Sequence, residues 1–155
     1  CEFAAVLALQ VAKKEKNYFI GGFSTIFHPL AVNANMSIRE AADAINERNS
    51  CGTDAAQAYE YALANKIVAD AFIMITDEQS WAGSQHPSQA LDKYRKALNP
   101  DAKAIYITLA PKRDDVGLAD PNDDKAWTIV GFDANIFRIL QEIVEGKAVD
   151  GGEEE

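Results

Sequence analysis

The sequence predicts an α/β fold in which a mainly parallel sheet carries helices on both faces. Apolar runs of strand character alternate with stretches of helical spacing, and this alternation is typical of βα units. The chain has 155 residues, of which 48% are hydrophobic, and this is enough for one core. Because neither a repeat nor a linker interrupts the pattern, we expect one domain over residues 1–147 and a disordered acidic tail over 148–155.

The first half of the chain is expected to form a helix, a hairpin and two further helices. Their predicted positions are residues 1–12, 18–30, 37–49 and 54–63. Gly21-Gly22 within the hairpin predicts a bulge or a close backbone approach. Ser37-Ile-Arg-Glu40 is a capping box, and Ile38 is expected on the buried face of its helix. Asp54, with Gln57 three residues later, is expected to cap the next helix.

The second half of the chain is expected to alternate strands and helices. The predicted strands are residues 71–76, 103–109 and 127–130, and the predicted helices are residues 87–98 and 133–145. Pro87 suits a first helical turn, Asp133 is expected to cap the last helix, and Gly146 is expected to end it. The basic run Lys93-Tyr94-Arg95-Lys96 is expected to form a solvated helix face.

Charge and composition argue against several classes of partner. The formal net charge is −9, and the lysines and arginines are dispersed in short groups. Since counterion release rewards clustered cations, we expect no strong nucleic-acid binding by this chain itself. Cys1 and Cys51 belong to no metal-ligand pattern and are expected to be buried free thiols in a reducing compartment. No apolar stretch approaches the roughly 20 residues of a membrane span, so we expect a cytoplasmic protein without membrane contact.

Asp77 is the most informative residue for function. It follows the apolar run 71–76, so a buried strand would present its carboxylate at the edge where ligands bind to parallel sheets. Thr53 lies at another loop-to-helix junction, from which it is expected to reach the same edge. Oxygen ligands of this kind suit a hard cation such as Mg²⁺. The alternatives are a structural cap or a catalytic carboxylate at Asp77, and a helix cap at Thr53.

The sequence offers little support for an enzyme. Neither histidine, His28 or His86, has the spacing of a metal ligand, and His86 is expected to shape a helix start. The nucleophile elbow, the P-loop and the dinucleotide fingerprint are all absent from the sequence. The run 120–131 imitates an EF-hand, but Lys125 and Gly131 replace the required glycine and glutamate, which predicts a solvated acidic loop. We therefore assign no catalytic residue.

Several segments resemble the von Willebrand factor A-like domain of Ro ribonucleoproteins. The stretch from Trp81-Ala-Gly83 to His86-Pro87 is fairly specific to Ro proteins, whereas Thr76-Asp77 at a strand end occurs in A domains in general. Further agreement comes from Ala90-Leu91, Tyr94-Arg95-Lys96, Gly52-Thr53-Asp54, Ala119-Asp120-Pro121 and Gly131-Phe132-Asp133. The resemblance extends over nearly all of the chain up to about Val144.

The resemblance implies a Rossmann-like von Willebrand factor A fold with a metal-ion-dependent adhesion site. In that family the site combines an Asp-x-Ser-x-Ser loop with a threonine from a second loop and an aspartate from a third. Thr53 matches the second element and Asp77 the third, but the chain contains no Asp-x-Ser-x-Ser. The family carries that loop on a central first strand, which the resemblance therefore places before Cys1. Without it we expect marginal stability, and weak or no binding of Mg²⁺ or another divalent cation.

The resemblance also implies an interaction and scaffold domain of an RNA-binding protein. Small noncoding and misfolded RNA would be bound by a helical-repeat (TROVE) module that is not among these residues. A protein ligand is expected at the metal site, with Glu78 and Trp81 as contacts, although packing over the sheet edge is the alternative for Trp81. Two other functions stay open: a metal-dependent protein-binding A domain of an unrelated protein, and a flavodoxin-like or phosphotransfer enzyme in which Asp77 reacts.

Overall fold

The predicted α/β class is confirmed by the computed structural model, which describes residues 2–23, 27–47, 54–76, 86–108, 119–131 and 135–146. Its helices are α1 Glu2–Lys14, α2 Ile38–Glu47, α3 Ala56–Ala64, α4 Pro87–Ala97 and α5 Ile136–Glu145. Its strands are β1 Gly21–Phe23, β2 Phe27–Pro29, β3 Ala71–Thr76, β4 Lys103–Thr108 and β5 Ala126–Val130. None of the described helices has the length and apolar composition needed to cross a bilayer. The predicted acidic tail lies outside the described residues.

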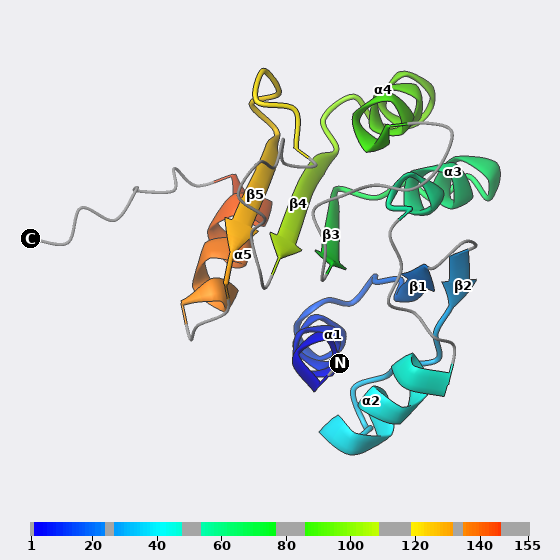
Figure 1. Cartoon of the computed structure of the whole chain (residues 1–155), viewed down its shortest axis with the longest axis vertical. Helices are drawn as coiled ribbons and strands as arrows, with labels where there is room; N and C mark the ends of the chain where they lie inside the picture. The colour runs from blue at the N-terminus through cyan, green and yellow to red at the C-terminus, as the bar shows by residue number, and fades with distance from the viewer. Residues whose placement is uncertain are drawn as a thin grey trace, which may run out of the picture.

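The main sheet of the described residues consists of three parallel strands. β4 lies between β3 and β5, with Ala71 paired to Lys103 and Ala104 paired to Ala126. β1 and β2 form a separate antiparallel hairpin, which lies between α3 and the helices α1 and α2 in Figure 1. Among the described strands β3 pairs with β4 alone. The strand expected before Cys1 stays a prediction.

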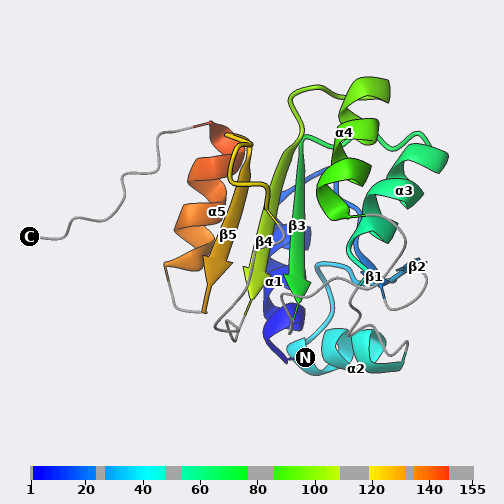
Figure 2. The ribbon, with the colours of Figure 1, turned by 45° about the horizontal axis from the view of Figure 1, so that its top comes forward.

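Helices cover both faces of the parallel sheet, as predicted (Figure 2). On one face α3 and α4 pack against Met74, Ala104 and Tyr106. On the other face α5 and α1 pack against Ile105 and Ile107. Because successive side chains of a strand point to opposite faces, neighbouring residues of β4 enter different clusters. From Ala104 onward every residue of β4 is buried, so this strand forms the centre of the described sheet.

The hairpin is shorter than predicted, and its packing explains Gly21. β1 begins at Gly21 rather than at residue 18, and it pairs with β2 in a continuous register that contains no bulge. A Cβ atom at Gly21 would overlap the aromatic ring of Phe27. The predicted close approach is therefore confirmed, with a side-chain ring as the neighbour, and glycine is required because it has no Cβ.

The capping box at the start of α2 is confirmed, whereas one residue of its predicted buried face is exposed. The backbone N–H of Glu40 donates to Ser37 Oγ at 3.2 Å, and the backbone N–H of Ser37 donates to Glu40 Oε2 at 2.7 Å. Ile38 is 51% exposed, so its assignment to the core is wrong. It lies in the first turn, at the end of the face that Ala41, Ala42 and Ile45 bury.

The observed ends of α4 and α5 match the ends predicted from the sequence in part. Pro87 occupies the first turn of α4, and His86 is the N-cap, where its Nδ1 accepts a 3.2 Å hydrogen bond from a backbone N–H of that turn. Gly146 ends α5 in the left-handed region with φ 75°. The N-cap of α5 is Asn135, whereas Asp133, the predicted cap, lies outside the described residues.

The prediction of a solvated basic face on α4 is wrong for Arg95. The residue is 9% exposed, although the lysines beside it in the run are exposed. Its Nε and Nη2 donate to the carbonyl oxygen of Ala102 at 2.9 and 2.7 Å, and Nη1 forms an ion pair with Asp123. Nη2 also donates to the carbonyl oxygen of Lys125 at 3.4 Å. The planar guanidinium thus joins α4 to the segments that precede β4 and β5.

Candidate functional site

The candidate site lies at the carboxyl end of the parallel strands. β3 ends at Thr76 and β4 at Thr108, and these two residues are register partners. α3 begins just after Asp54 at the same end of the sheet, and its other end leads to the start of β3 (Figure 2). Ligands bind at this end of open parallel sheets because loops from neighbouring strands meet there.

The four residues predicted to form the site lie outside the described residues. They are Thr53, Asp77, Glu78 and Trp81. Their roles stay predictions from the sequence. Two of them have immediate neighbours that the structure places, since Asp54 follows Thr53 and Thr76 precedes Asp77 in the chain.

Thr108 carries a buried hydroxyl that has no hydrogen-bond partner among the described residues. The residue is 1% exposed. Its backbone carbonyl oxygen accepts a 2.8 Å hydrogen bond from the N–H of Gly131, so the end of the strand is anchored. Burial of an unpaired hydroxyl costs about 1–3 kcal/mol in proteins. Sequence reasoning missed Thr108, because threonine is common in strands and only strand pairing places it beside the predicted site.

Asp54 carries a second atom of this kind. Its Oδ2 accepts a 3.0 Å hydrogen bond from Gln57 Nε2, whereas its Oδ1 is buried without a partner among the described residues. The prediction that Asp54 caps α3 is wrong: the N-cap is Ala55, with helical φ −64° and ψ −20°, and no side chain caps the helix. Because Ala55 is already helical, the Asp54 side chain binds the Gln57 side chain instead of a backbone N–H.

We call Asp54 Oδ1 and Thr108 Oγ1 the two unpaired oxygens. Oxygen atoms suit a hard cation such as Mg²⁺, which prefers oxygen ligands and usually keeps several waters. Nowhere in the described ranges do three or more His, Cys, Asp or Glu residues form a group that could hold a metal ion. The two unpaired oxygens therefore fit contacts around a hydrated cation, but they do not make a complete ligand set by themselves.

A buried tyrosine pair lies on the same side of β4 as Thr108. Tyr106 precedes Thr108 by two residues, and its hydroxyl lies 2.5 Å from that of Tyr59 on α3. Burial raises the pKa of Tyr106 to about 12. Burial, reinforced by the neighbouring Tyr106, also raises the pKa of Tyr59 well above its ordinary value. Both hydroxyls therefore stay protonated at neutral pH, and the pair contributes no charge to the site.

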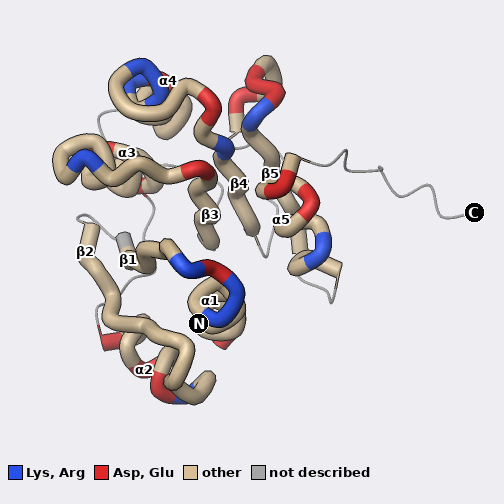
Figure 3. Tube along the Cα trace, turned by 180° about the vertical axis from the view of Figure 1, so that it is seen from behind, with Lys and Arg blue, Asp and Glu red and all other residues tan. Residues whose placement is uncertain are grey.

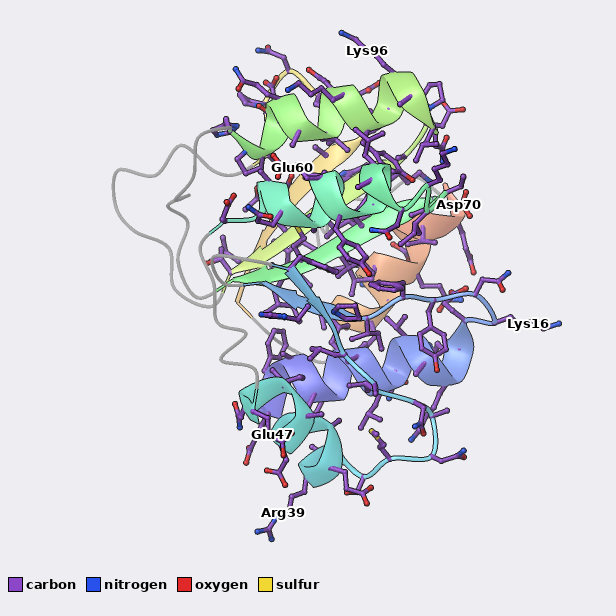
Figure 4. All side chains as sticks on the ribbon, turned by 90° about the vertical axis from the view of Figure 1, so that its right-hand side faces the viewer. Lys16, Arg39, Glu47, Glu60, Asp70 and Lys96 are labelled. Atoms are coloured by element: carbon purple, nitrogen blue, oxygen red, sulfur yellow. The ribbon has the colours of Figure 1, made fainter. Side chains whose placement is uncertain are left out.

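The charged surface residues are dispersed rather than gathered into one basic region. Figure 3 shows lysine and arginine positions interspersed with acidic positions along the helices. In Figure 4 the side chains of Lys16, Arg39 and Lys96 point outward from separate parts of the surface. All three residues are exposed. The described cations are therefore dispersed over the surface, as the sequence predicts.

Comparison with known proteins shows consistent similarity to one group. The Ro60 vWA domain model matches residues 1–144. The chain is 28% identical over 144 residues to the RNA-binding protein RO60 of Deinococcus radiodurans. This alignment covers 93% of this chain and 27% of that protein. It is 35% identical over 119 residues to the RNA-binding protein RO60 of Caenorhabditis elegans. That alignment covers 76% of this chain and 18% of the relative.

The fold is also similar to a solved structure of the same group. The crystal structure of the Deinococcus radiodurans RO (RSR) protein superposes with a TM-score of 0.80 at 25% sequence identity. The superposition covers 95% of this chain and 29% of that chain. The described arrangement is therefore the Ro vWA fold, and the chain spans less than a third of the length of each of these relatives.

Proposed function

The chain belongs to the Ro60 vWA domain family, and from this membership we propose that it is a non-catalytic interaction and scaffold domain of a cytoplasmic Ro-like RNA-binding protein. The match of the family model to residues 1–144 carries this proposal. The relatives in Deinococcus radiodurans and Caenorhabditis elegans are named as RNA-binding proteins, and the chain spans 27% and 18% of their lengths. In our proposal a helical-repeat (TROVE) module of the full protein binds small noncoding and misfolded RNA.

The charge of the chain supports this division of roles. A net charge of −9 repels a phosphate backbone, and no cluster of cations in the described residues offsets this repulsion. Arg95, which the sequence places in a basic run, is engaged inside the fold with Ala102 and Asp123. The domain is therefore suited to partners other than RNA.

The same proposal includes a divalent-cation site at the carboxyl end of the sheet. Thr53 and Asp77 are the proposed protein ligands, and Mg²⁺ is the proposed cation, bound weakly. The two unpaired oxygens support this site. One belongs to Asp54, which follows Thr53 in the chain, and the other belongs to Thr108, the register partner of Thr76, which precedes Asp77. When bound, the cation would supply positive charge for a carboxylate of a protein ligand, with Glu78 and Trp81 as further contacts.

RNA binding tests the division of roles. We expect the purified protein to bind a small structured RNA at least about a hundredfold more weakly than a version extended to include the helical-repeat module, since phosphate contacts dominate such affinities. Fluorescence anisotropy at two salt concentrations measures this difference. Affinity of the chain alone that equals the extended version and falls steeply with salt would contradict the proposal.

A metal titration tests the proposed ligands. Calorimetry with Mg²⁺ should show weak binding to the parent protein, and this binding should be lost in Thr53→Ala and in Asp77→Ala. The matched controls are Thr128→Ala and Asp92→Ala, because both residues are exposed on other parts of the fold. Equal metal binding by the parent and by both site variants would remove the ligand assignment.

A further inference from the structure

We propose that the outer edge of β5, the side that faces away from β4, binds an extended basic segment of a partner protein as an additional strand. Strand addition of this kind gains its affinity from main-chain hydrogen bonds. The surface lies apart from the carboxyl end of the sheet. Its role rests on the proposed function of the chain as an interaction domain, and it adds the chemical class of a partner to that function.

The backbone of β5 is open on one side. Among the described strands β5 pairs with β4 alone. The N–H of Gly131 donates to the carbonyl oxygen of Thr108 on β4 at 2.8 Å. Because successive residues of a strand direct their backbone groups to opposite sides, Thr128 and Val130 direct their N–H and C=O groups away from β4. These groups therefore have no described strand beside them.

The side chains of the same two residues are accessible. Trp127 and Ile129 pack in the cluster that α5 covers. By alternation, Thr128 and Val130 lie on the opposite face of the sheet, where α3 and α4 pack over the other two strands. Thr128 is exposed, and Val130 is 53% exposed. A strand added at this edge would therefore contact both the backbone and an apolar side chain.

β5 also lacks the features that usually prevent pairing at an edge. Proteins protect edge strands with lysine, proline or a β-bulge. Residues 126–130 contain neither lysine nor proline, and they pair with β4 in a continuous register. All of them except Ala126 are β-branched or aromatic, and such residues favour strand pairing. The edge is thus suited to accept an extended segment.

The charge beside the edge indicates that this segment is basic. The turn before β5 carries Asp120 and Asp124, and Asp124 is exposed. Lys125 Nζ is engaged elsewhere, since it donates to the carbonyl oxygen of Pro100 at 2.8 Å and lies 3.6 Å from Asp101 Oδ1. Figure 3 shows further acidic positions on α5 beside β5. Together with a net charge of −9, this arrangement attracts a segment that carries lysine or arginine and repels an acidic one.

The open edge of β3 has different surroundings. β3 also pairs with β4 alone among the described strands. In Figure 1 its other side faces the β1–β2 hairpin and α1, and its residues Ile73 and Ile75 pack in the cluster that includes Leu7 of α1. That edge lies inside the domain, whereas the edge of β5 borders solvent.

A synthetic peptide tests the edge of β5. The probe alternates threonine and valine and carries lysines at both ends, so a lysine meets the acidic turn in either strand direction. Fluorescence anisotropy should show binding to the parent protein. Replacement of the lysines by glutamates should weaken binding at least about tenfold. Methylation of alternate backbone nitrogens of the peptide should weaken it similarly, because main-chain donors are lost.

Thr128→Pro removes an outward N–H without removing a hydrogen bond to β4, and proline is tolerated at edges of this kind. We expect this variant to bind the lysine peptide about tenfold more weakly, whereas Thr128→Ala keeps the N–H and should bind it as the parent does. Asp124→Lys should also weaken binding. Its control is Asp92→Lys, which makes the same change of charge at an exposed position of α4.

Hydrogen exchange at the amides of Thr128 and Val130 should slow when the lysine peptide is bound. This measurement needs no variant, so it decides the result if Thr128→Pro does not fold. Unchanged exchange at both amides, or equal binding of the lysine and glutamate peptides, would show that the proposal is wrong.

Other occupants of the edge give different results, each of which overturns the proposal. If the parent protein dimerises in analytical ultracentrifugation and Thr128→Pro does not, the edge binds a second copy. If a version extended to include the helical-repeat module does not bind the peptide although this chain does, the edge is covered within the full protein. Neither result affects the division of roles in the proposed function, which the RNA measurement decides separately.

Discussion

The two ends of the parallel sheet use their polar side chains differently. At the amino end these side chains bind segments that are distant in the chain. Arg95 binds Asp123, Asn99 Nδ2 donates to the carbonyl oxygen of Ala69 at 3.0 Å, and Lys103 Nζ donates to that of Ile143 at 2.7 Å. At the carboxyl end the described contacts of Asp54 are local, and its Oδ1 and Thr108 Oγ1 have no described partner. One end therefore joins the fold together, and the other retains acceptors that a ligand would satisfy.

This difference separates stability from binding within one small domain. Parallel sheets collect their ligands at the carboxyl end, where loops of different strands converge. Polar groups at the amino end are already hydrogen-bonded and are not available to a ligand. Loss of one of these hydrogen bonds leaves a buried group without a partner. Substitutions at the amino end should therefore lower stability, whereas substitutions at the carboxyl end should change ligand binding at little cost to the fold.

The largest expected effect is that of Arg95→Met at the amino end. The substitution leaves the carboxylate of Asp123 and the carbonyl oxygen of Ala102 without their donor, and breaking a buried ion pair in this way costs about 3–5 kcal/mol. Urea unfolding measures the loss. Lys96→Met on the same helix is the control, and it should change the free energy of unfolding little because Lys96 is exposed. A loss below about 1 kcal/mol for Arg95→Met would show that the amino end does not join the fold together.

High pH is expected to weaken the core between the two ends. The pKa of Tyr106 is raised to about 12 in the folded protein by burial, whereas an unfolded tyrosine has a pKa near 10. The folded state thus keeps a proton that the unfolded state releases, so this contribution is fully present below about pH 10 and is lost as the pH rises toward 12. The loss of unfolding free energy expected from Tyr106 alone is at most about 3 kcal/mol. Tyr59, whose pKa is also raised by burial, adds a loss of the same sign.

Urea unfolding at several values between about pH 8 and pH 11 follows this loss. The control is the double variant Tyr59→Phe, Tyr106→Phe, which removes both buried hydroxyls and should flatten the dependence above about pH 10. A parent protein whose free energy of unfolding stays constant over the whole range would contradict the burial of the pair in its protonated form.

A smaller effect is expected for Tyr94→Phe, which removes one hydroxyl near the start of β3. That hydroxyl donates to the carbonyl oxygen of Ile67 and accepts from the N–H of Ala69, both at 2.7 Å. Its loss leaves two backbone groups unpaired and should cost about 2 kcal/mol in urea unfolding. Tyr61→Phe is the matched control, since it keeps the ring that packs on Phe27 at 4.6 Å between centroids. Equal losses in the two variants would show that the Tyr94 hydroxyl has no special role at this end.

Local patterns in the sequence predicted the elements that depend on a few neighbouring residues. The capping box of Ser37 and Glu40, the first-turn position of Pro87 and the helix end at Gly146 each involve groups within about one helical turn. Arg95 was assigned to solvent because its ion-pair partner, Asp123, lies 28 residues away in the chain. Its role depends on tertiary packing, which helical periodicity does not encode.

The sequence predicted a site at the carboxyl end of the sheet, but it did not point to Thr108. The apolar run that ends at Thr76 predicted Asp77 at the edge where parallel sheets bind ligands, and a loop-to-helix junction predicted Thr53 near the same edge. The resemblance to Ro proteins matched both residues. Thr108 could not be found in this way, because its relevance depends on its register with Thr76 and on the burial of its hydroxyl. Both properties exist only after the strands have paired.

The smallest expected effect is that of Thr108→Val in the absence of metal, at the carboxyl end. Valine has nearly the same shape as threonine and removes a hydroxyl that is unpaired among the described residues, so the free energy of unfolding should stay unchanged or rise by up to about 1 kcal/mol. Urea unfolding in the presence of a chelator measures this change, with the exposed Thr128→Val as the control. A loss of more than about 1 kcal/mol would mean that the hydroxyl stabilises the metal-free fold through a hydrogen bond. The carboxyl end would then resemble the amino end, because its polar groups would be engaged in holding the chain together before any ligand binds.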